Sequence, residues 1–240
     1  MFNGSVLNSR GRVLPALATI PLVLLAGCGV AGTEFHPGIA ADVGDQTITT
    51  RHVDKVTDEY CKAVEVVSKG QDQAAGSERP MRYLSNIFAQ ALVTQAAAEQ
   101  LAGEYGVQPT TSYTSSLKKL EPELVKLNDD EKAAVREVVG AQAYNQDVLT
   151  QIGEISLKKQ GTTNASTDDQ YAEGQKLLDT WMRDHDVTVN PKYSIDFDSK
   201  ANPADTDVSY ALGAAAKGGL EATPGPEYTD ALPADQVCLD

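Results

Sequence analysis

The chain has 240 residues, of which 41% are hydrophobic and only 6% aromatic, and its formal net charge is −14. This length allows one domain with a real core and flexible ends, or two small domains. The acidic balance argues against nucleic-acid binding, because neutralising phosphates requires clustered Lys and Arg side chains; a role in solubility accounts for the charge.

The first residues have the pattern of an export signal. Arg10 and Arg12 precede an apolar run, residues 13–25, which has signal-peptide length and is short for a membrane span. The run ends in Leu-Ala-Gly-Cys28, which resembles a bacterial lipobox, where a small residue precedes a cysteine that is lipidated and becomes N-terminal. We expect a signal peptide over residues 1–27 and a lipid on Cys28. An ordinary secretory signal with a chance cysteine and an uncleaved membrane anchor are the alternatives.

A lipid on Cys28 would hold the mature chain at the extracytoplasmic face of a cell membrane, since two palmitate-type acyl chains give stable anchoring. Residues 28–38, rich in Gly and Ala, would then form a short tether. The predicted organisation is therefore a signal peptide (1–27), a tether (28–38), a helical domain (39–198) and an extended tail (199–240).

A short strand and a turn are expected over residues 40–49, where Val43 and Ile48 flank a Gly-Asp turn. Apolar residues at spacings of three and four then predict five amphipathic helices. These helices are expected from Thr49 or Thr50 to Gly70, from Pro80 to Gly106, from Tyr113 to Pro122, over 128–159, and from a Thr167–Gln170 capping box to about Met182.

A second short strand is expected at residues 186–190, where Val187 is a candidate to pair with Val43. The predicted fold is mainly α, with a small two-strand element that brings the ends of the domain together. Beyond residue 199 the chain is rich in Ala, Gly, Pro, Asp and Thr without periodicity, which predicts an extended or partly disordered tail.

Three cysteines occur in the chain. If Cys28 carries a lipid, Cys61 and Cys238 remain, and disulfides persist outside the cytoplasm. We expect a Cys61–Cys238 disulfide. Two free thiols, or a bridge between molecules, are the alternatives.

The segment Ala41-Asp42-Val43-Gly44-Asp45-Gln46-Thr47-Ile48-Thr49, followed by a helix with Val53-Asp54, resembles the opening of the SurA N-terminal domain. Residues 181–191, which end in Val-Thr-Val-Asn-Pro, resemble its closing helix and strand. The resemblance extends over about residues 39–193. It implies an extracytoplasmic folding factor of the SurA/PrsA type, whose helices form a cradle for unfolded clients.

Many members of that family also carry a parvulin prolyl isomerase domain, which this sequence lacks. Only His36, His52 and His185 are present, and Lys217-Gly218-Gly219-Leu220-Glu221 lacks the flanking strands of the parvulin motif. The histidines have no metal-ligand spacing, and His52 and His185 are expected at the surface without local partners. We find no catalytic constellation, phosphate loop or cofactor motif, so no enzyme activity, metal or cofactor is expected.

These observations favour a lipid-anchored lipoprotein that binds unfolded or extended secreted polypeptides as a holdase. A structural or interaction lipoprotein of the cell envelope is the alternative, and a divergent peptidyl-prolyl isomerase is less favoured. The expected partners are secreted polypeptides and, through the lipid, the membrane.

Overall fold

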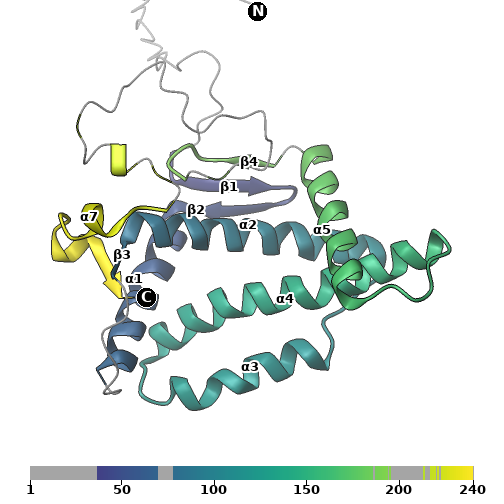
Figure 1. Cartoon of the computed structure of the whole chain (residues 1–240), viewed down its shortest axis with the longest axis horizontal. Helices are drawn as coiled ribbons and strands as arrows, with labels where there is room; N and C mark the ends of the chain where they lie inside the picture. The colour runs from purple at the N-terminus through teal and green to yellow at the C-terminus, as the bar shows by residue number, and fades with distance from the viewer. Residues whose placement is uncertain are drawn as a thin grey trace, which may run out of the picture. The chain divides into compact units, whose positions relative to one another are not determined.

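The computed structural model describes residues 37–69, 78–185, 187–193, 195, 213, 217–219, 221 and 223–239. In this part of the chain, five long helices and two small sheets form the domain in Figure 1. The predicted mainly helical fold with a small strand element is confirmed. The predicted signal peptide, Cys28 and the tether up to residue 36 lie outside the described residues.

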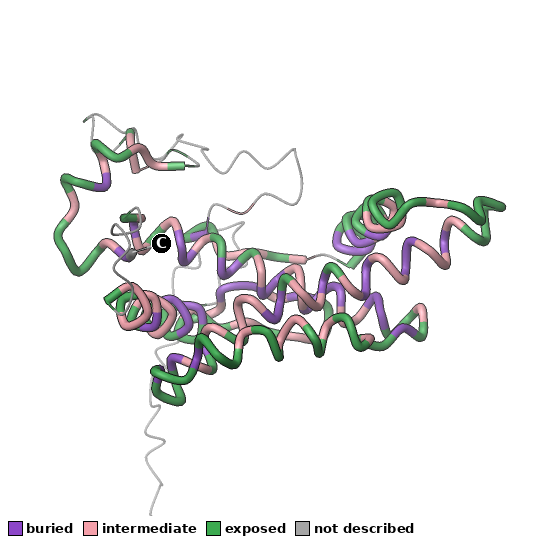
Figure 2. Tube along the Cα trace, turned by 60° about the horizontal axis from the view of Figure 1, so that its bottom comes forward, coloured by how far each residue is buried: buried purple, intermediate pink, exposed green. Residues whose placement is uncertain are grey.

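The long helices lie where the apolar periodicity predicts them. Their bounds are α1 (Thr50–Ser68), α2 (Met81–Tyr105), α3 (Thr111–Leu124), α4 (Asp129–Lys159) and α5 (Thr167–Asp184). Pro122 lies inside α3, which ends two residues later. Leu124 is the one buried residue of α3, and the helix packs along the outside of α4 through half-buried contacts such as that of Tyr113 with Tyr144 (Figures 1 and 2).

Local signals set the ends of α2 and α4. Asn128 accepts a hydrogen bond from the Glu131 amide while the Glu131 side chain accepts one from the Asn128 amide, a capping box that fixes the start of α4. Helix α2 ends at Gly106, whose φ of +66° lies in the left-handed region that favours glycine.

The capping box of α5 differs from the predicted one. Ser166 and Asp169 form it, one residue before the expected Thr167 and Gln170. Both sets have a hydroxyl followed three residues later by a side chain that can return the bond, so the sequence pattern alone does not distinguish the two registers.

The first sheet closes the domain by joining its two ends. It contains β1 (Ile39–Val43), β2 (Gln46–Thr49) and β4 (Thr188–Val189), antiparallel and in the order β2-β1-β4. Ala41 pairs with Val189 and Asp42 with Thr188. Val43 and Val187, the residues expected to pair, lie one step further along the same register. The sheet thus has one strand more than the two predicted, because residues 46–49 pair as well.

The β1–β2 turn is fixed to α2 by one side chain. Gly44 has a φ of +56°, which the tight turn requires. Gln100 Nε2 donates to the Val43 carbonyl at 2.8 Å, and its Oε1 accepts from the Asp45 amide at 3.4 Å. The hairpin therefore has a defined position over α2.

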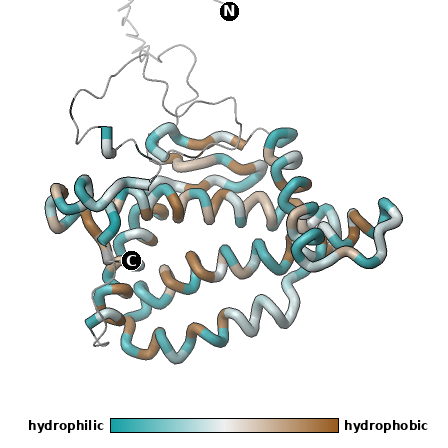
Figure 3. Tube along the Cα trace, viewed as in Figure 1, coloured by the Kyte–Doolittle hydropathy of each residue, from teal (hydrophilic) through white to brown (hydrophobic). Residues whose placement is uncertain are grey.

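The main core lies where β1 meets α2, α4 and α5. Its buried members are mostly aliphatic: Ala41, Val43, Val93, Ala96, Ala97, Ala98, Leu101, Ala102, Val107, Val148, Leu149, Ile152, Leu178, Trp181 and Met182. Trp181 Nε1 donates to Glu104 Oε1 at 2.6 Å, so the polar atom of this large ring has a partner. Figure 3 shows apolar residues of α2, α4 and α5 interspersed with hydrophilic ones along each helix, as amphipathic packing requires.

Helices α4 and α5 touch through their backbones at two glycines. A Cβ atom on Gly174 would collide with the Leu149 carbonyl, and one on Gly153 would collide with the Gln170 carbonyl. Both glycines are buried and helical. Only hydrogen in place of a side chain lets these two helices approach so closely.

The end of the chain forms a second sheet. Residues 226–229 form the short helix α7 (Pro226–Thr229), a 3₁₀ turn spans Ala234–Gln236, and β5 (Val237–Leu239) pairs antiparallel with β3 (Glu78–Pro80). The predicted tail therefore ends in ordered structure against the start of α2 (Figure 1). Residues 199–212 lie outside the described residues.

Cys61 and Cys238 form the predicted disulfide, and their Cα atoms lie 5.4 Å apart, within the range usual for such a bridge. Cys238 is buried in a small second core with Val56, Leu84, Phe88 and Ala134. The bridge therefore connects the tail to α1 at a place where α1, α2 and α4 also meet.

We expect Gly174→Ala to lower the free energy of unfolding by about 1–3 kcal/mol, because the added methyl meets the backbone of α4. Gly103→Ala is the matched control: it lies in α2 with nothing within 4 Å of its added Cβ. That variant should gain up to about 1 kcal/mol from the better helix propensity of alanine. Chemical denaturation measures both, and equal effects of the two substitutions would contradict the close contact.

Removal of the disulfide in Cys61→Ala/Cys238→Ala should lower the free energy of unfolding by about 2–4 kcal/mol, because the 177-residue separation is no longer constrained in the unfolded chain. The wild-type protein in reductant should match the double variant. Wild-type protein that keeps its full stability in reductant would argue against a stabilising bridge.

Candidate functional site

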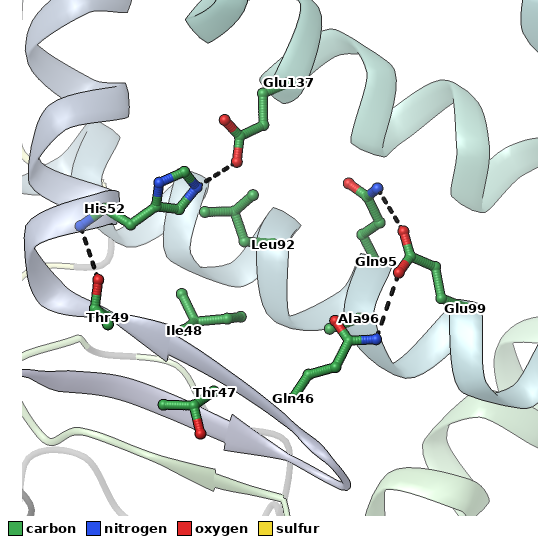
Figure 4. A pocket seen from close by; sticks show the side chains of 10 residues that line it. All are labelled: Gln46, Thr47, Ile48, Thr49, His52, Leu92, Gln95, Ala96, Glu99 and Glu137. Atoms are coloured by element: carbon green, nitrogen blue, oxygen red, sulfur yellow. Dashed lines mark hydrogen bonds and ion pairs between the residues drawn. The ribbon is translucent and has the colours of Figure 1, made fainter.

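A cleft of about 510 Å³ lies beside the free side of β2. Strand β2, the start of α1, the middle of α2 and one turn of α4 surround it, as Figure 4 shows. Its volume falls in the range of protein ligand sites, about 300–1,000 Å³. The cleft is therefore a candidate for a binding site in the described part of the chain.

The centre of the cleft is apolar. Leu92 and Ala96 lie one turn apart on α2 and are 8% and 5% exposed, and Ile48 of β2 faces them (Figure 4). Ile48 faces α2 because alternate residues of a strand point to opposite sides, so that Gln46 and Ile48 are half-buried while Thr47 and Thr49 are exposed.

One end of the cleft is formed by a histidine–carboxylate pair. His52 Nε2 of α1 lies 2.5 Å from Glu137 Oε1 of α4. The backbone of His52 is held as well, since its amide donates to Thr49 Oγ1 at 3.2 Å as the cap of α1. His52 is exposed, as the sequence predicts, but its partner lies 85 residues away in the chain.

The opposite end is formed by Glu99 of α2. Its two carboxylate oxygens accept from Gln95 Nε2 at 2.8 Å and from Gln46 Nε2 at 3.5 Å. Both donors are neutral amides, so they orient the carboxylate without cancelling its charge. The cleft thus has an apolar centre with an acidic group at each end.

The hydroxyl groups that line the cleft serve the structure. Thr49 Oγ1 caps α1, and Thr47 Oγ1 donates to Asp42 Oδ1 at 2.6 Å. In the described part of the chain, no three His, Cys, Asp or Glu side chains are grouped as a metal site. A ligand in this cleft could therefore be bound through its fit to the apolar centre, through backbone hydrogen bonds of β2, and through the carboxylates at the two ends.

A second cleft, of about 520 Å³, lies between the ordered tail and the helices. Residues of α1, the start of α2 and the tail line it, together with Lys192 and Tyr193. Lys192 Nζ is paired with Asp54 at 2.8 Å. Burial raises the pKa of the Tyr193 hydroxyl. Neither this hydroxyl nor that of Ser85 has a hydrogen-bond partner of ordinary geometry among the described groups. Both oxygen atoms are buried, so they are not accessible to a ligand in this cleft.

The predicted site residues lie in different places. Cys61 and Cys238 meet, away from the residues that line the β2 cleft. Cys28 and His36 lie outside the described residues. His185 stacks on Trp181 with ring centroids 4.0 Å apart and does not line either cleft. Among the helices of the described residues, none combines the length and apolarity needed to span a membrane.

The sequence reasoning missed Glu99 and Glu137. Both belong to helices that it predicted, but their positions on those helices give no sign that they face a common space. The available signal was weak: Gln46, Gln95 and Glu99 are polar residues on or next to apolar faces, where a polar side chain is expected to have a partner.

Tyr144 on α4 reports on this region through its pKa. Burial, and then the negative charge of Glu99, raise the pKa of Tyr144 to about 12. The folded-state pKa of Tyr144 exceeds its unfolded value of about 10. The protonated Tyr144 therefore contributes its full stabilisation below about pH 10, and this stabilisation is lost as pH rises through the folded-state pKa. Ultraviolet titration should find one tyrosine ionising near pH 12, and Tyr144→Phe should flatten the pH dependence of unfolding between pH 10 and 12. An unchanged profile would contradict this assignment.

Comparison of the chain with models of protein families, with curated proteins and with solved structures finds no match. The resemblance to the SurA N-terminal domain accordingly stays a prediction.

Proposed function

We propose that this domain binds extended segments of unfolded secreted polypeptides in the cleft beside β2, as a holdase. A lipid on Cys28 would keep it at the extracytoplasmic face of a cell membrane. The observation that carries the proposal is that β2 is an edge strand whose four residues all line the cleft. An unpaired strand edge is a template for a further strand.

The register of the hairpin identifies the backbone groups available for this pairing. Val43 and Gln46 flank the two-residue turn and form a hydrogen-bonded pair, so the next pair, Asp42 and Thr47, is not hydrogen-bonded within the hairpin. The amide and carbonyl of Thr47 therefore point away from β1, to the side where the cleft lies. A polypeptide segment in the cleft can accept a hydrogen bond from the Thr47 amide and donate one to the Thr47 carbonyl.

The size of the edge fits weak, sequence-tolerant binding. Four strand residues extend over about 10 Å from the first to the last Cα atom, enough for a few backbone hydrogen bonds, each with a net value of about 0.5–1.5 kcal/mol. Backbone bonds do not depend on the sequence of the client, and a folded protein rarely exposes an unpaired strand. Unfolded chains are thus the ligands that this edge suits best.

The SurA resemblance supports the same class of function, since it implies a helical cradle for unfolded clients. The alternative, an interaction lipoprotein of the cell envelope, draws support from the fixed polar groups at both ends of the cleft, which suit a defined partner. Capture of one folded partner without binding to unfolded chains would favour this alternative.

The test is suppression of aggregation of a reduced, unfolding client by the wild-type domain, with Thr47→Pro as the variant. Proline at an edge position removes the outward amide without breaking the bonds to β1. Thr47→Val is the matched control, because it also loses the side-chain bond to Asp42 but keeps the amide. We expect about 3- to 10-fold weaker activity for Thr47→Pro than for Thr47→Val, in line with one backbone hydrogen bond.

Absence of suppression by the wild-type domain at several-fold molar excess would exclude a holdase. Equal activity of the two variants, both folded by circular dichroism, would exclude strand addition to β2 as its mechanism.

A further inference from the structure

We propose that the β2 cleft selects extended segments with a basic side chain on each side of an apolar one. This inference rests on the proposed function and specifies its ligand. It follows from the order of chemical groups along the cleft, which runs from acidic through apolar to acidic.

The charges in the cleft have one sign. Glu137 and Glu99 lie at its two ends, and among its ten lining residues there is no Lys or Arg. His52 is the one lining residue that can carry a positive charge, and its ring is paired with Oε1 of Glu137 (Figure 4). A cationic group entering the cleft therefore meets two carboxylates, one of them shared with His52, and no Lys or Arg side chain.

Both carboxylates are held in place yet open to a ligand. Glu137 and His52 have side chains that are 30% and 45% exposed. Glu99 is oriented by Gln95 and Gln46, which leave its charge intact. Because each carboxylate is fixed before a ligand arrives, a cation binds without ordering the acidic side chain first.

Strand geometry relates these groups to a ligand sequence. In an extended segment, residues i, i+2 and i+4 face the same side, and i and i+4 lie about 13 Å apart. The four residues of β2 span about 10 Å from the first to the last Cα atom, so residues i and i+4 of a paired segment would lie at or just beyond the two ends of the strand. An apolar residue at i+2 would meet Leu92, Ala96 and Ile48, and basic residues at i and i+4 would reach the acidic ends.

Charge also argues against a second copy of this chain as the occupant. Two β2 edges paired with each other would bring the Glu99 and Glu137 carboxylates of both copies to one seam, where like charges repel. An extended segment with the opposite charge is the better complement.

The test measures fluorescence anisotropy of labelled ten-residue peptides that contain Lys-Thr-Val-Thr-Lys, or the same sequence with Gln or Glu in place of both Lys residues. We expect the Lys peptide to bind about tenfold tighter than the Gln peptide, as two partly exposed charge pairs provide, and the Glu peptide to bind weakest. The advantage of Lys should shrink in 0.5 M salt, since exposed ion pairs are screened.

Glu99→Gln/Glu137→Gln should bind the Lys and Gln peptides equally. Glu123→Gln/Asp179→Asn is the matched control, because it removes the same charge from two exposed residues outside the cleft and should keep the preference for Lys. If the preference for the Lys peptide survives in the cleft variant or is lost in the control variant, the preference comes from the overall charge of the protein. Either result would overturn this inference.

Binding of the Lys and Gln peptides with equal affinity by the wild-type domain would overturn the inference and leave the proposed function standing. Failure of all three peptides to bind would overturn both. Sedimentation would then reveal whether a dimer has closed the β2 edge.

Discussion

The backbone contact of α4 with α5 at Gly153 and Gly174 is the constraint on which the rest of the domain depends. It places Trp181 and Met182 in the main core and directs the chain after α5 back across the domain. The chain can then form β4 beside β1. Because β1 also pairs with β2, the position of the cleft depends on the crossing of α4 and α5, although neither Gly153 nor Gly174 lines the cleft.

The proposed function gives the cleft two kinds of recognition that would act separately. The backbone edge of β2 would pair with any extended chain, whereas the carboxylates of Glu99 and Glu137 would discriminate among chains by charge. These groups come from β2, α2 and α4, elements held by the hairpin turn on Gln100 and by the core. A site built from rigid elements loses little entropy on binding, which suits ligands that must themselves be ordered.

The sequence predicts the elements well because their signals are local. Apolar spacing, the Asn128 cap and Gly106 predict the helices, and cysteine parity together with the expected export signal predicts the Cys61–Cys238 pairing. The cleft could not be predicted, since it depends on pairs such as His52 with Glu137, which lie 85 residues apart on different helices. Helix periodicity indicates which face of a helix is apolar but does not specify which polar residues of two helices meet.

The N-cap of α5 shows a similar limit of sequence patterns. Ser166 forms this cap instead of the predicted Thr167, because two adjacent hydroxyl residues both fit the capping-box pattern.

The disulfide also affects what happens when a protease cuts the chain. Cys61 and Cys238 are separated by 177 residues, so α2, α3, α4 and α5 all lie within the covalent loop that they close. A single cut anywhere in that loop, for example in the exposed turn before α5, produces two fragments that stay covalently joined. Each fragment keeps its packing partners at a high effective concentration, so a nicked molecule can retain the fold.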